Sequence, residues 1–131
     1  MADSQTAAVK WTAPHTTVVT GATGWLGRAL VHRLLADPHR ARLRLLAQSG
    51  ADSDRLRAFV GEQNSDNDRD NGGSKQPVVD IVIGDIAKAD TAARLLHDVG
   101  SNTDVLHTAG VIHPQRVRDF YAVNENGTRH L

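Results

Sequence analysis

Apolar residues along this chain alternate between short β-branched runs and longer stretches with helical spacing. The short runs predict strands over residues 16–20, 43–47, 78–83 and 104–107. The helical spacing predicts helices over residues 25–36, 53–60, 89–99 and 117–131. Strands that alternate with helices are joined by right-handed crossovers, and helices cover both faces of the resulting sheet. The pattern therefore predicts an α/β fold with a doubly wound parallel sheet of strand order 3-2-1-4.

Two segments show no apolar periodicity. Residues 1–15 lack the apolar core of a signal peptide, so we expect a flexible N-terminal tail there. Residues 62–76 are polar and contain glycine, and they bury too little apolar surface to offset the entropy of ordering. We expect a mobile insertion at 62–76 within a single domain over 16–131.

The first predicted helix indicates how it packs. Its residues Leu26, Ala29, Leu30 and Leu34 share one helical face, which is expected to contact the sheet. Trp25 at the start of the helix is expected to pack over the preceding turn.

Composition narrows the possible partners. Fifteen Lys and Arg residues balance fifteen Asp and Glu residues, so the chain lacks the basic excess typical of proteins that bind nucleic acid or anionic membranes. There is no cysteine, which excludes disulfides and thiolate chemistry and is compatible with a reducing compartment. No segment approaches the length of a membrane span, and the seven histidines show no metal-site spacing. We expect a cytoplasmic protein without a metal, whose partners are small molecules.

The segment from Thr20 to Gly27 carries the most specific chemistry. Gly21, Gly24 and Gly27 recur at three-residue spacing between a predicted strand and a predicted helix. A turn without Cβ atoms, with free N–H groups and the positive end of a helix dipole, is suited to a nucleotide pyrophosphate. The spacing G-x-x-G-x-x-G follows the logic of a dinucleotide fingerprint, although its letters differ from G-x-G-x-x-G. The alternative is a glycine-rich loop that holds no ligand.

Four motifs in order resemble the extended branch of the short-chain dehydrogenase/reductase family, the branch of NAD(P)-dependent epimerases, dehydratases and reductases. They are the glycine motif, Gly84-Asp85-Ile86, His107-Thr108-Ala109-Gly110, and the helix segment Val123-Asn124-Glu125-Asn126-Gly127-Thr128. The resemblance covers residues 16–131 and implies a Rossmann-like fold that binds a dinucleotide.

The resemblance also implies roles for individual residues. Asp85 would accept a hydrogen bond from the adenine amino group, with a solvated turn aspartate as the alternative. Asn124 would order a water in a proton relay, with a polar surface residue as the alternative, whereas His107 is expected to be structural rather than catalytic. The cofactor would lie against Gly21, Ala22, Thr23, Gly24, Trp25, Leu26, Gly27, Gln48, Ser49, Asp85, Ile86, Thr108, Ala109 and Gly110.

The end of the second predicted strand bears on cofactor choice. An NAD-specific domain places an acidic residue there to bind the ribose diol, but this chain has Gln48 and Ser49. Arg28, Arg42 and Arg44 are close in sequence and are suited to a 2′-phosphate. We therefore expect NADP rather than NAD, with outward-pointing arginines as the alternative.

One departure concerns catalysis. The family uses a tyrosine and a lysine four residues later for proton transfer, but Tyr121, the single tyrosine, is followed at that spacing by Glu125.

The predicted last helix also has no stop signal, so the chain is expected to be truncated. This leaves three hypotheses: the cofactor-binding portion of an oxidoreductase or epimerase that is inactive alone, a non-catalytic nucleotide-binding sensor or scaffold, and a non-functional truncated product. The fourth strand is expected to lie at an unpaired edge, through which the chain can self-associate.

Overall fold

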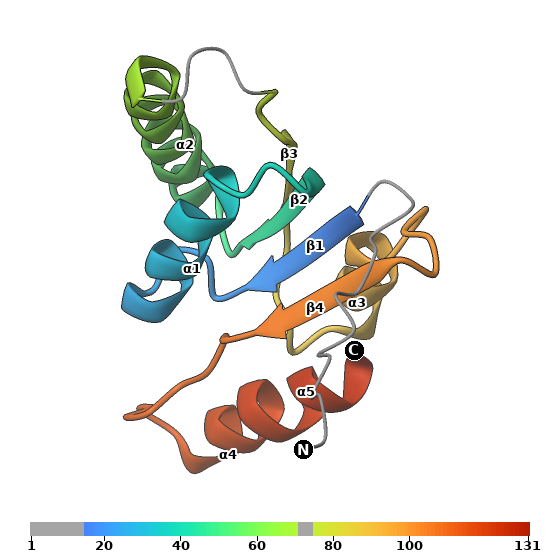
Figure 1. The fold of residues 1–131 in the computed structure, drawn as a ribbon. Helices are drawn as coiled ribbons and strands as arrows, with labels where there is room; N and C mark the ends of the chain where they lie inside the picture. Colours follow the sequence, from blue (N-terminus) through green and yellow to red (C-terminus); the bar gives the residue numbers. More distant parts are fainter. Residues whose placement is uncertain (1–14, 71–74) are drawn as a thin grey trace, which may run out of the picture.

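Four parallel strands form one sheet in the order β3-β2-β1-β4. The computed structural model describes residues 15–70 and 75–131. The strands are β1 (His15–Thr20), β2 (Arg40–Ala47), β3 (Val78–Ile83) and β4 (Thr103–His107). The arrowheads of β1 and β4 point the same way (Figure 1), toward the end of the sheet where the glycine turn follows β1. The predicted Rossmann-like fold and its strand order are confirmed.

Helices pack on both faces of the sheet. One face is covered by α1 (Trp25–Leu35) and α2 (Gly50–Asp70). The other carries α3 (Ala89–Leu95) and a continuous helical stretch made of α4 (Val117–Phe120), the π-helix η1 (Tyr121–Asn126) and α5 (Gly127–His130). Consecutive strand residues point to opposite faces. Val19 accordingly packs beneath α1 and α2, while Val18 belongs to the core beside α3.

The buried face of α1 differs from the predicted one. Gly27, Val31, Leu34 and Leu35 are buried, whereas Leu26 is 50% exposed. The helix is rotated so that Gly27 lies against the preceding turn, and the residues four, seven and eight positions later then face the sheet. Trp25 is 89% exposed, so the expectation that it packs over the turn is wrong.

Helix α2 is longer than predicted. It runs from Gly50 to Asp70, so the predicted end of the helix at residue 60 is wrong, whereas the expected mobility of residues 62–76 stays a prediction. Apolar periodicity stops at Val60, but the helix continues with polar residues. Among them, Asp66 and Arg69 form an ion pair at 3.7 Å, a spacing that supports a helix. Residues 71–74 of the expected insertion lie outside the described residues, as do residues 1–14 of the expected tail.

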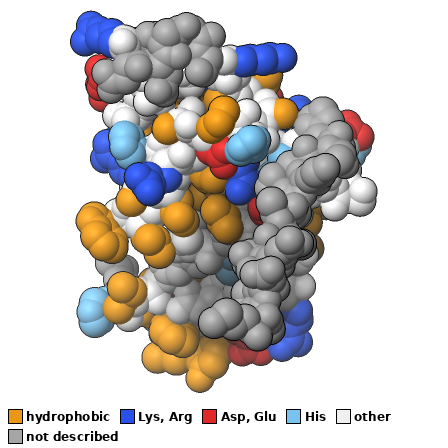
Figure 2. Space-filling model, in the orientation of Figure 1, with side chains coloured by type: hydrophobic (Ala, Val, Ile, Leu, Met, Phe, Trp, Pro, Cys, Tyr) orange, Lys and Arg blue, Asp and Glu red, His pale blue; other side chains and the backbone are white. Residues whose placement is uncertain are grey.

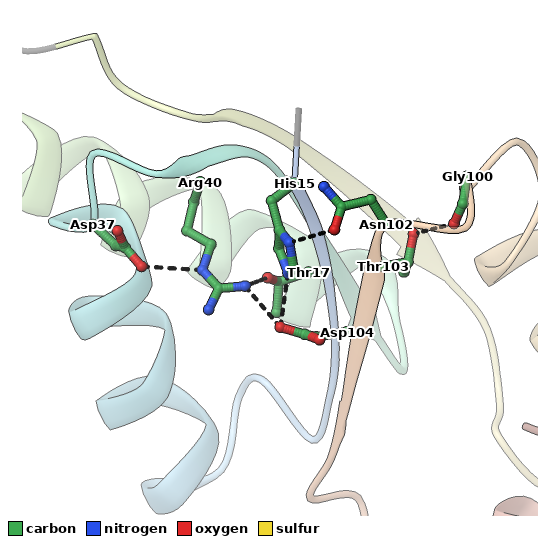
Figure 3. Close-up of polar contacts among 8 residues, drawn as sticks. All are labelled: His15, Thr17, Asp37, Arg40, Gly100, Asn102, Thr103 and Asp104. Carbon is green, nitrogen blue, oxygen red and sulfur yellow. Dashed lines mark hydrogen bonds and ion pairs between the residues drawn. The ribbon is translucent and has the colours of Figure 1, made fainter. Parts of the chain in front are cut away.

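A polar network joins the amino ends of three strands (Figure 3). His15, placed at the end of the tail by sequence, is instead the first residue of β1 and is 2% exposed. Its Nε2 donates to Asp104 Oδ2 at 2.7 Å, and its Nδ1 lies 3.0 Å from Asn102 Oδ1. Arg40 Nη1 donates to the same Asp104 oxygen and to Thr17 Oγ1, and the Arg40 hydrogen bond holds the pKa of Asp104 below its usual value. This network joins β1, β2 and β4 at the amino end of the sheet, opposite the end that carries the glycine turn.

Strand β4 borders only β1 within the part of the chain that the structure describes, so association of two copies through its other edge stays a prediction. No helix among the described residues is both long and apolar enough to cross a membrane. Residues 15–70 and 75–131 likewise contain no cluster of three or more potential metal ligands.

Candidate dinucleotide site

The carboxyl ends of the strands surround one cavity of about 220 Å³. Ligands of open α/β sheets collect at this edge because the loops diverge there and leave a crevice. The cavity is lined by Gly21, Thr23, Gly24, Leu46, Gln48, Gly84, Asp85, Ile86, Thr108, Ala109, Gly110, Val111 and Val123. All four sequence motifs therefore contribute to one cavity. The helix segment contributes a single residue, Val123, and each of the other three motifs contributes three residues.

The glycine turn is shaped by close contacts between backbone segments. Gly21 has φ +68°, a left-handed conformation that favours glycine, and a Cβ there would lie 2.6 Å from Ala109 N. A Cβ on Gly27 would lie 1.9 Å from Gly21 O, so α1 touches the turn at this point. Gly21 and Gly27 are thus required by the protein's own packing.

Gly24 has a different role. A Cβ there would meet only Gly21 O, at 3.3 Å, and Gly24 lines the cavity. It is also the N-cap of α1, where no side chain caps the helix and no acidic residue occupies the first turn. The first N–H groups of α1 and the positive end of its dipole are therefore available to an anion beside a surface without a side chain.

Gln48 and Ser49, which follow the end of β2, have different roles. Gln48 lines the cavity, whereas the Ser49 hydroxyl accepts a hydrogen bond from Asp52 N at 3.2 Å and so caps α2. Ser49 therefore begins a helix, and only Gln48 occupies the position where an NAD-specific domain has its carboxylate.

The end of β3 is organised by an aspartate turn. Asp85 Oδ1 accepts a hydrogen bond from Ala87 N at 2.9 Å, and Asp85 also lines the cavity. Ile86 is 5% exposed and packs against Gly127, where a Cβ would lie 3.1 Å from Ile86 Cγ2. The glycine thus allows α5 to approach this loop closely.

The hydroxyl of Thr20 joins β1 to β4. It accepts hydrogen bonds from Thr108 N and Ala109 N, both at 3.2 Å, and lies 2.6 Å from His107 Nδ1. Since both acceptor positions of the hydroxyl are used, its own hydrogen is donated to Nδ1. His107 Nε2 then carries the ring hydrogen and donates to Thr128 Oγ1 at 2.9 Å.

Because His107 is bonded on both ring nitrogens to threonine hydroxyls, it acts as a structural link between β1, β4 and α5. Burial lowers its pKa, which agrees with a neutral ring that accepts at Nδ1. Protonation would place a second donor against the Thr20 hydroxyl and disrupt this link.

The lowered pKa of His107 predicts a loss of stability in weak acid. A histidine whose pKa is depressed in the folded state stabilises the fold above its ordinary pKa of about 6.5, and this contribution disappears as the pH falls below that value. Urea unfolding at pH 7.5 and 5.5 is expected to show a smaller pH dependence in His107→Gln than in the original chain. The exposed His113→Gln variant should keep the full dependence, and an unchanged dependence in His107→Gln would contradict the assignment.

Asn124 fastens the π-helix to the loop that follows β4. Its Nδ2 donates to Val111 O at 2.9 Å, and its Oδ1 accepts from Val111 N at 2.8 Å. Its main-chain oxygen accepts from Thr128 Oγ1 at 2.6 Å. These contacts make Asn124 a positioning residue for the Gly110–Val111 backbone, and its expected water-ordering role stays a prediction.

The structure places some of the predicted cofactor residues on the cavity and others, including the helix-capping Ser49, outside its lining. Gly21, Thr23, Gly24, Gln48, Asp85, Ile86, Thr108, Ala109 and Gly110 line the cavity. Ala22 and Gly27 are buried beneath the turn, and Trp25 and Leu26 are exposed on the first turn of α1. Gly84, Leu46, Val111 and Val123 also line the cavity but were not predicted to contact the cofactor. Leu46 lies in β2, Val111 in the loop after β4 and Val123 in the π-helix, and such apolar residues carry no distinctive sequence signal.

Two arginines expected near a 2′-phosphate lie elsewhere. Arg42 pairs with Asp80 on β3, and Arg44 donates to the carbonyl oxygens of Leu95 and His97 at the end of α3. Both residues precede the carboxyl end of β2 and are bonded to β3 or to the end of α3, so their assignment to the cofactor is wrong. Arg28 instead lies on α1 next to the glycine turn.

Comparison with known proteins gives the family. The model of the NAD-binding family described as "Male sterility protein" matches residues 19–131. Over 52 residues the chain is 46% identical to the spectinabilin polyketide synthase system protein NorA of Streptomyces orinoci, covering 40% of this chain and 3% of that protein.

Solved structures agree with the fold. A thiolation-reductase di-domain from an archaeal non-ribosomal peptide synthetase matches with TM-score 0.65 and 20% identity, over 90% of this chain and 31% of its own. A short-chain type dehydrogenase/reductase from Mycobacterium ulcerans matches with TM-score 0.65 and 24% identity, over 88% of this chain and 43% of its own. The chain thus spans less than half of the solved chains it resembles. It belongs to the NAD-binding family described as "Male sterility protein", with the Rossmann-like fold of short-chain dehydrogenases/reductases.

Proposed function

We propose that this chain forms the NAD(P)-binding portion of a reductase. The observation that carries the proposal is the cavity at the carboxyl edge, where residues from the glycine turn and from the ends of β2, β3 and β4 converge. Four glycines line this cavity, so its walls expose backbone where side chains would otherwise fill the space.

The residues present fit a dinucleotide. The uncapped N-terminus of α1 beside Gly24 suits the pyrophosphate, and Asp85 and Ile86 suit the adenine. Thr108, Ala109 and Gly110 would border the ribose and nicotinamide at the end of β4, with the loop held in place by Asn124. When bound, the dinucleotide supplies hydride chemistry, and this chain's own part is to bind and orient it.

The proposed cofactor is NADP rather than NAD. Gln48 leaves the end of β2 without a carboxylate to repel a 2′-phosphate, and Arg28 lies on the first helix beside the turn. We expect calorimetric titration to show tighter binding of NADPH than of NADH. Tighter binding of NADH would contradict this preference.

Gly24→Val tests the site itself. The branched side chain would project into the cavity, and its Cβ would lie 3.3 Å from Gly21 O, a contact that a small shift of the turn relieves. Binding of both nucleotides should therefore be lost while the fold remains, which circular dichroism of the variant checks. Gly100→Val is a matched control, because Gly100 is exposed and a Cβ there meets no atom within 4 Å. Unchanged nucleotide binding in Gly24→Val would exclude the glycine turn as the site.

We further propose that the substrate of the complete reductase carries a carbonyl group on an acyl chain. The identity with a polyketide synthase system protein over 52 residues supports this class. Reduction assays with the full-length protein, comparing thioester, aldehyde and nucleotide-sugar substrates, would test it. Activity confined to nucleotide sugars would refute it.

A second candidate is a nucleotide-binding module without catalysis. It is favoured by one observation, the absence of a Tyr-x-x-x-Lys pair among these 131 residues. Reading the DNA that follows codon 131 distinguishes the two proposals, because a downstream Tyr-x-x-x-Lys supports the reductase.

A further inference from the structure

A second cavity, of about 400 Å³, lies between the glycine turn, α1 and α2. It is lined by Thr23, Arg28, Asp52, Arg55, Leu56, Ala58, Phe59 and Glu62. Thr23 lines this cavity and also the one at the carboxyl edge. The two cavities therefore adjoin at the turn proposed to bind the pyrophosphate.

The Arg28 guanidinium lies over the face of Phe59 in this cavity. Arg28 Cζ is 4.7 Å from the centre of the ring, within the range of a cation–π contact. Phe59 is half-buried and packs against the core beneath α1 and α2, so the ring itself is held by that core. A fixed aromatic face thereby restricts an otherwise flexible arginine.

The two arginines of the cavity differ in their partners. Arg55 Nη1 lies 3.2 Å from Asp52 Oδ1, and Asp52 Oδ2 also accepts a hydrogen bond from Ser49. Arg28 forms no ion pair with any described residue. Glu62 also lines the cavity, so two acids balance the two arginines and net charge does not select a ligand. Any preference of this cavity for a phosphate group therefore depends on the position in which the Arg28 guanidinium is held.

We propose that Phe59 is a positioning residue that holds the Arg28 guanidinium beside the glycine turn and so sets the preference for a nucleotide with a 2′-phosphate. The inference rests on the proposed dinucleotide function and assigns a role to a residue of α2 outside every sequence motif. An arginine held in place before binding loses less rotamer freedom when it pairs with phosphate oxygens. The ring therefore favours the phosphorylated ribose and has no effect on the unphosphorylated one.

Titration calorimetry with 2′,5′-ADP and 5′-AMP tests this proposal, because the two probes differ by the 2′-phosphate. Phe59→Leu is expected to weaken binding of 2′,5′-ADP about two- to five-fold and to leave 5′-AMP unchanged. Phe59→Tyr, which keeps the aromatic face, should restore the original ratio. If Phe59→Leu does not unfold cooperatively, Phe59→Met supplies the same comparison with a side chain that fills irregular space.

A double-mutant cycle shows whether Phe59 acts through Arg28. In an Arg28→Gln background, Phe59→Leu should cause no further loss of 2′,5′-ADP binding. Arg57→Gln and Phe120→Leu are matched controls outside the cavity and should leave the ratio unchanged. An unchanged ratio of the affinities for 2′,5′-ADP and 5′-AMP in Phe59→Leu, or an equal loss in both backgrounds, overturns the proposal.

The original chain distinguishes failure of the two proposals. If it binds neither probe nor NADPH, the dinucleotide function itself fails. If it binds both probes equally, only the role of Phe59 and Arg28 fails.

Discussion

Gly27→Ala is expected to lower the free energy of unfolding by about 1–3 kcal/mol or more, the cost of forcing extra volume into a packed site. The added Cβ would lie 1.9 Å from Gly21 O and 2.7 Å from Gly21 C, far inside van der Waals contact. Backbone cannot rotate away as a flexible side chain does, so either α1 or the turn must move. Urea denaturation followed by circular dichroism measures the change, and nucleotide binding should fall with it.

Gly61→Ala is the matched control for that experiment. Gly61 also lies within a helix, but a Cβ there meets nothing within 4 Å. The same substitution should therefore stabilise the chain by about 0.5–1 kcal/mol through reduced backbone entropy of the unfolded state. Equal effects of the two substitutions would show that the contact between α1 and the turn is not what requires Gly27.

The second large expected effect is an absence of turnover. We expect this 131-residue chain to transfer no measurable hydride to aldehydes, ketones or nucleotide sugars when NADPH is supplied. A positioned general acid or base contributes about 100- to 10,000-fold to rate. Tyr121 has Glu125 rather than a lysine four residues later, and it is 55% exposed on the π-helix. Loss of NADPH absorbance over time is the direct measurement.

Calorimetry on the same preparation separates lack of chemistry from lack of binding. Bound NADPH without turnover agrees with a binding portion whose proton-transfer groups lie elsewhere. Turnover that disappears in Tyr121→Phe or Asn124→Ala would instead mean that these residues carry the chemistry. Asn124→Ala also removes both hydrogen bonds to Val111, so its unfolding must be measured alongside.

Exposed apolar side chains also surround the α4 end of the molecule. Val117 is 74% exposed and Ile112 is 82% exposed, and Figure 2 shows hydrophobic side chains gathered at the lower end of the view, where Figure 1 draws α4. Such residues have no signature in the sequence, because apolar spacing predicts a buried face wherever it occurs. Whether an apolar face is covered depends on what lies opposite it in the fold.

The arginines illustrate the limit of sequence proximity. Arg28, Arg42 and Arg44 are all close to the expected phosphate position along the chain, yet only Arg28 lies beside the turn. Arg42 and Arg44 share one face of β2 because strand residues alternate, and that face meets α3. Conversely, Phe59 lies in none of the motifs, but from α2 it contacts Arg28 on the neighbouring helix α1.

The sequence by itself determined the alternation of strands and helices, the order of the sheet and the position of the glycine turn. The alternation and the turn follow from local patterns, namely β-branched runs, helical spacing, and glycines where backbone must approach backbone. The order is the one that doubly wound sheets with this alternation adopt. The tertiary structure alone decided the rotation of α1 about Gly27, the extension of α2 past residue 61, the hydrogen-bonded link through His107 and the cavity that holds Arg28. The rotation of α1, the His107 link and the cavity depend on which residues meet across elements distant in sequence, and a pattern read along one segment does not contain that information. The extension of α2 involves polar residues within the helix, such as Asp66 and Arg69, which apolar periodicity does not register.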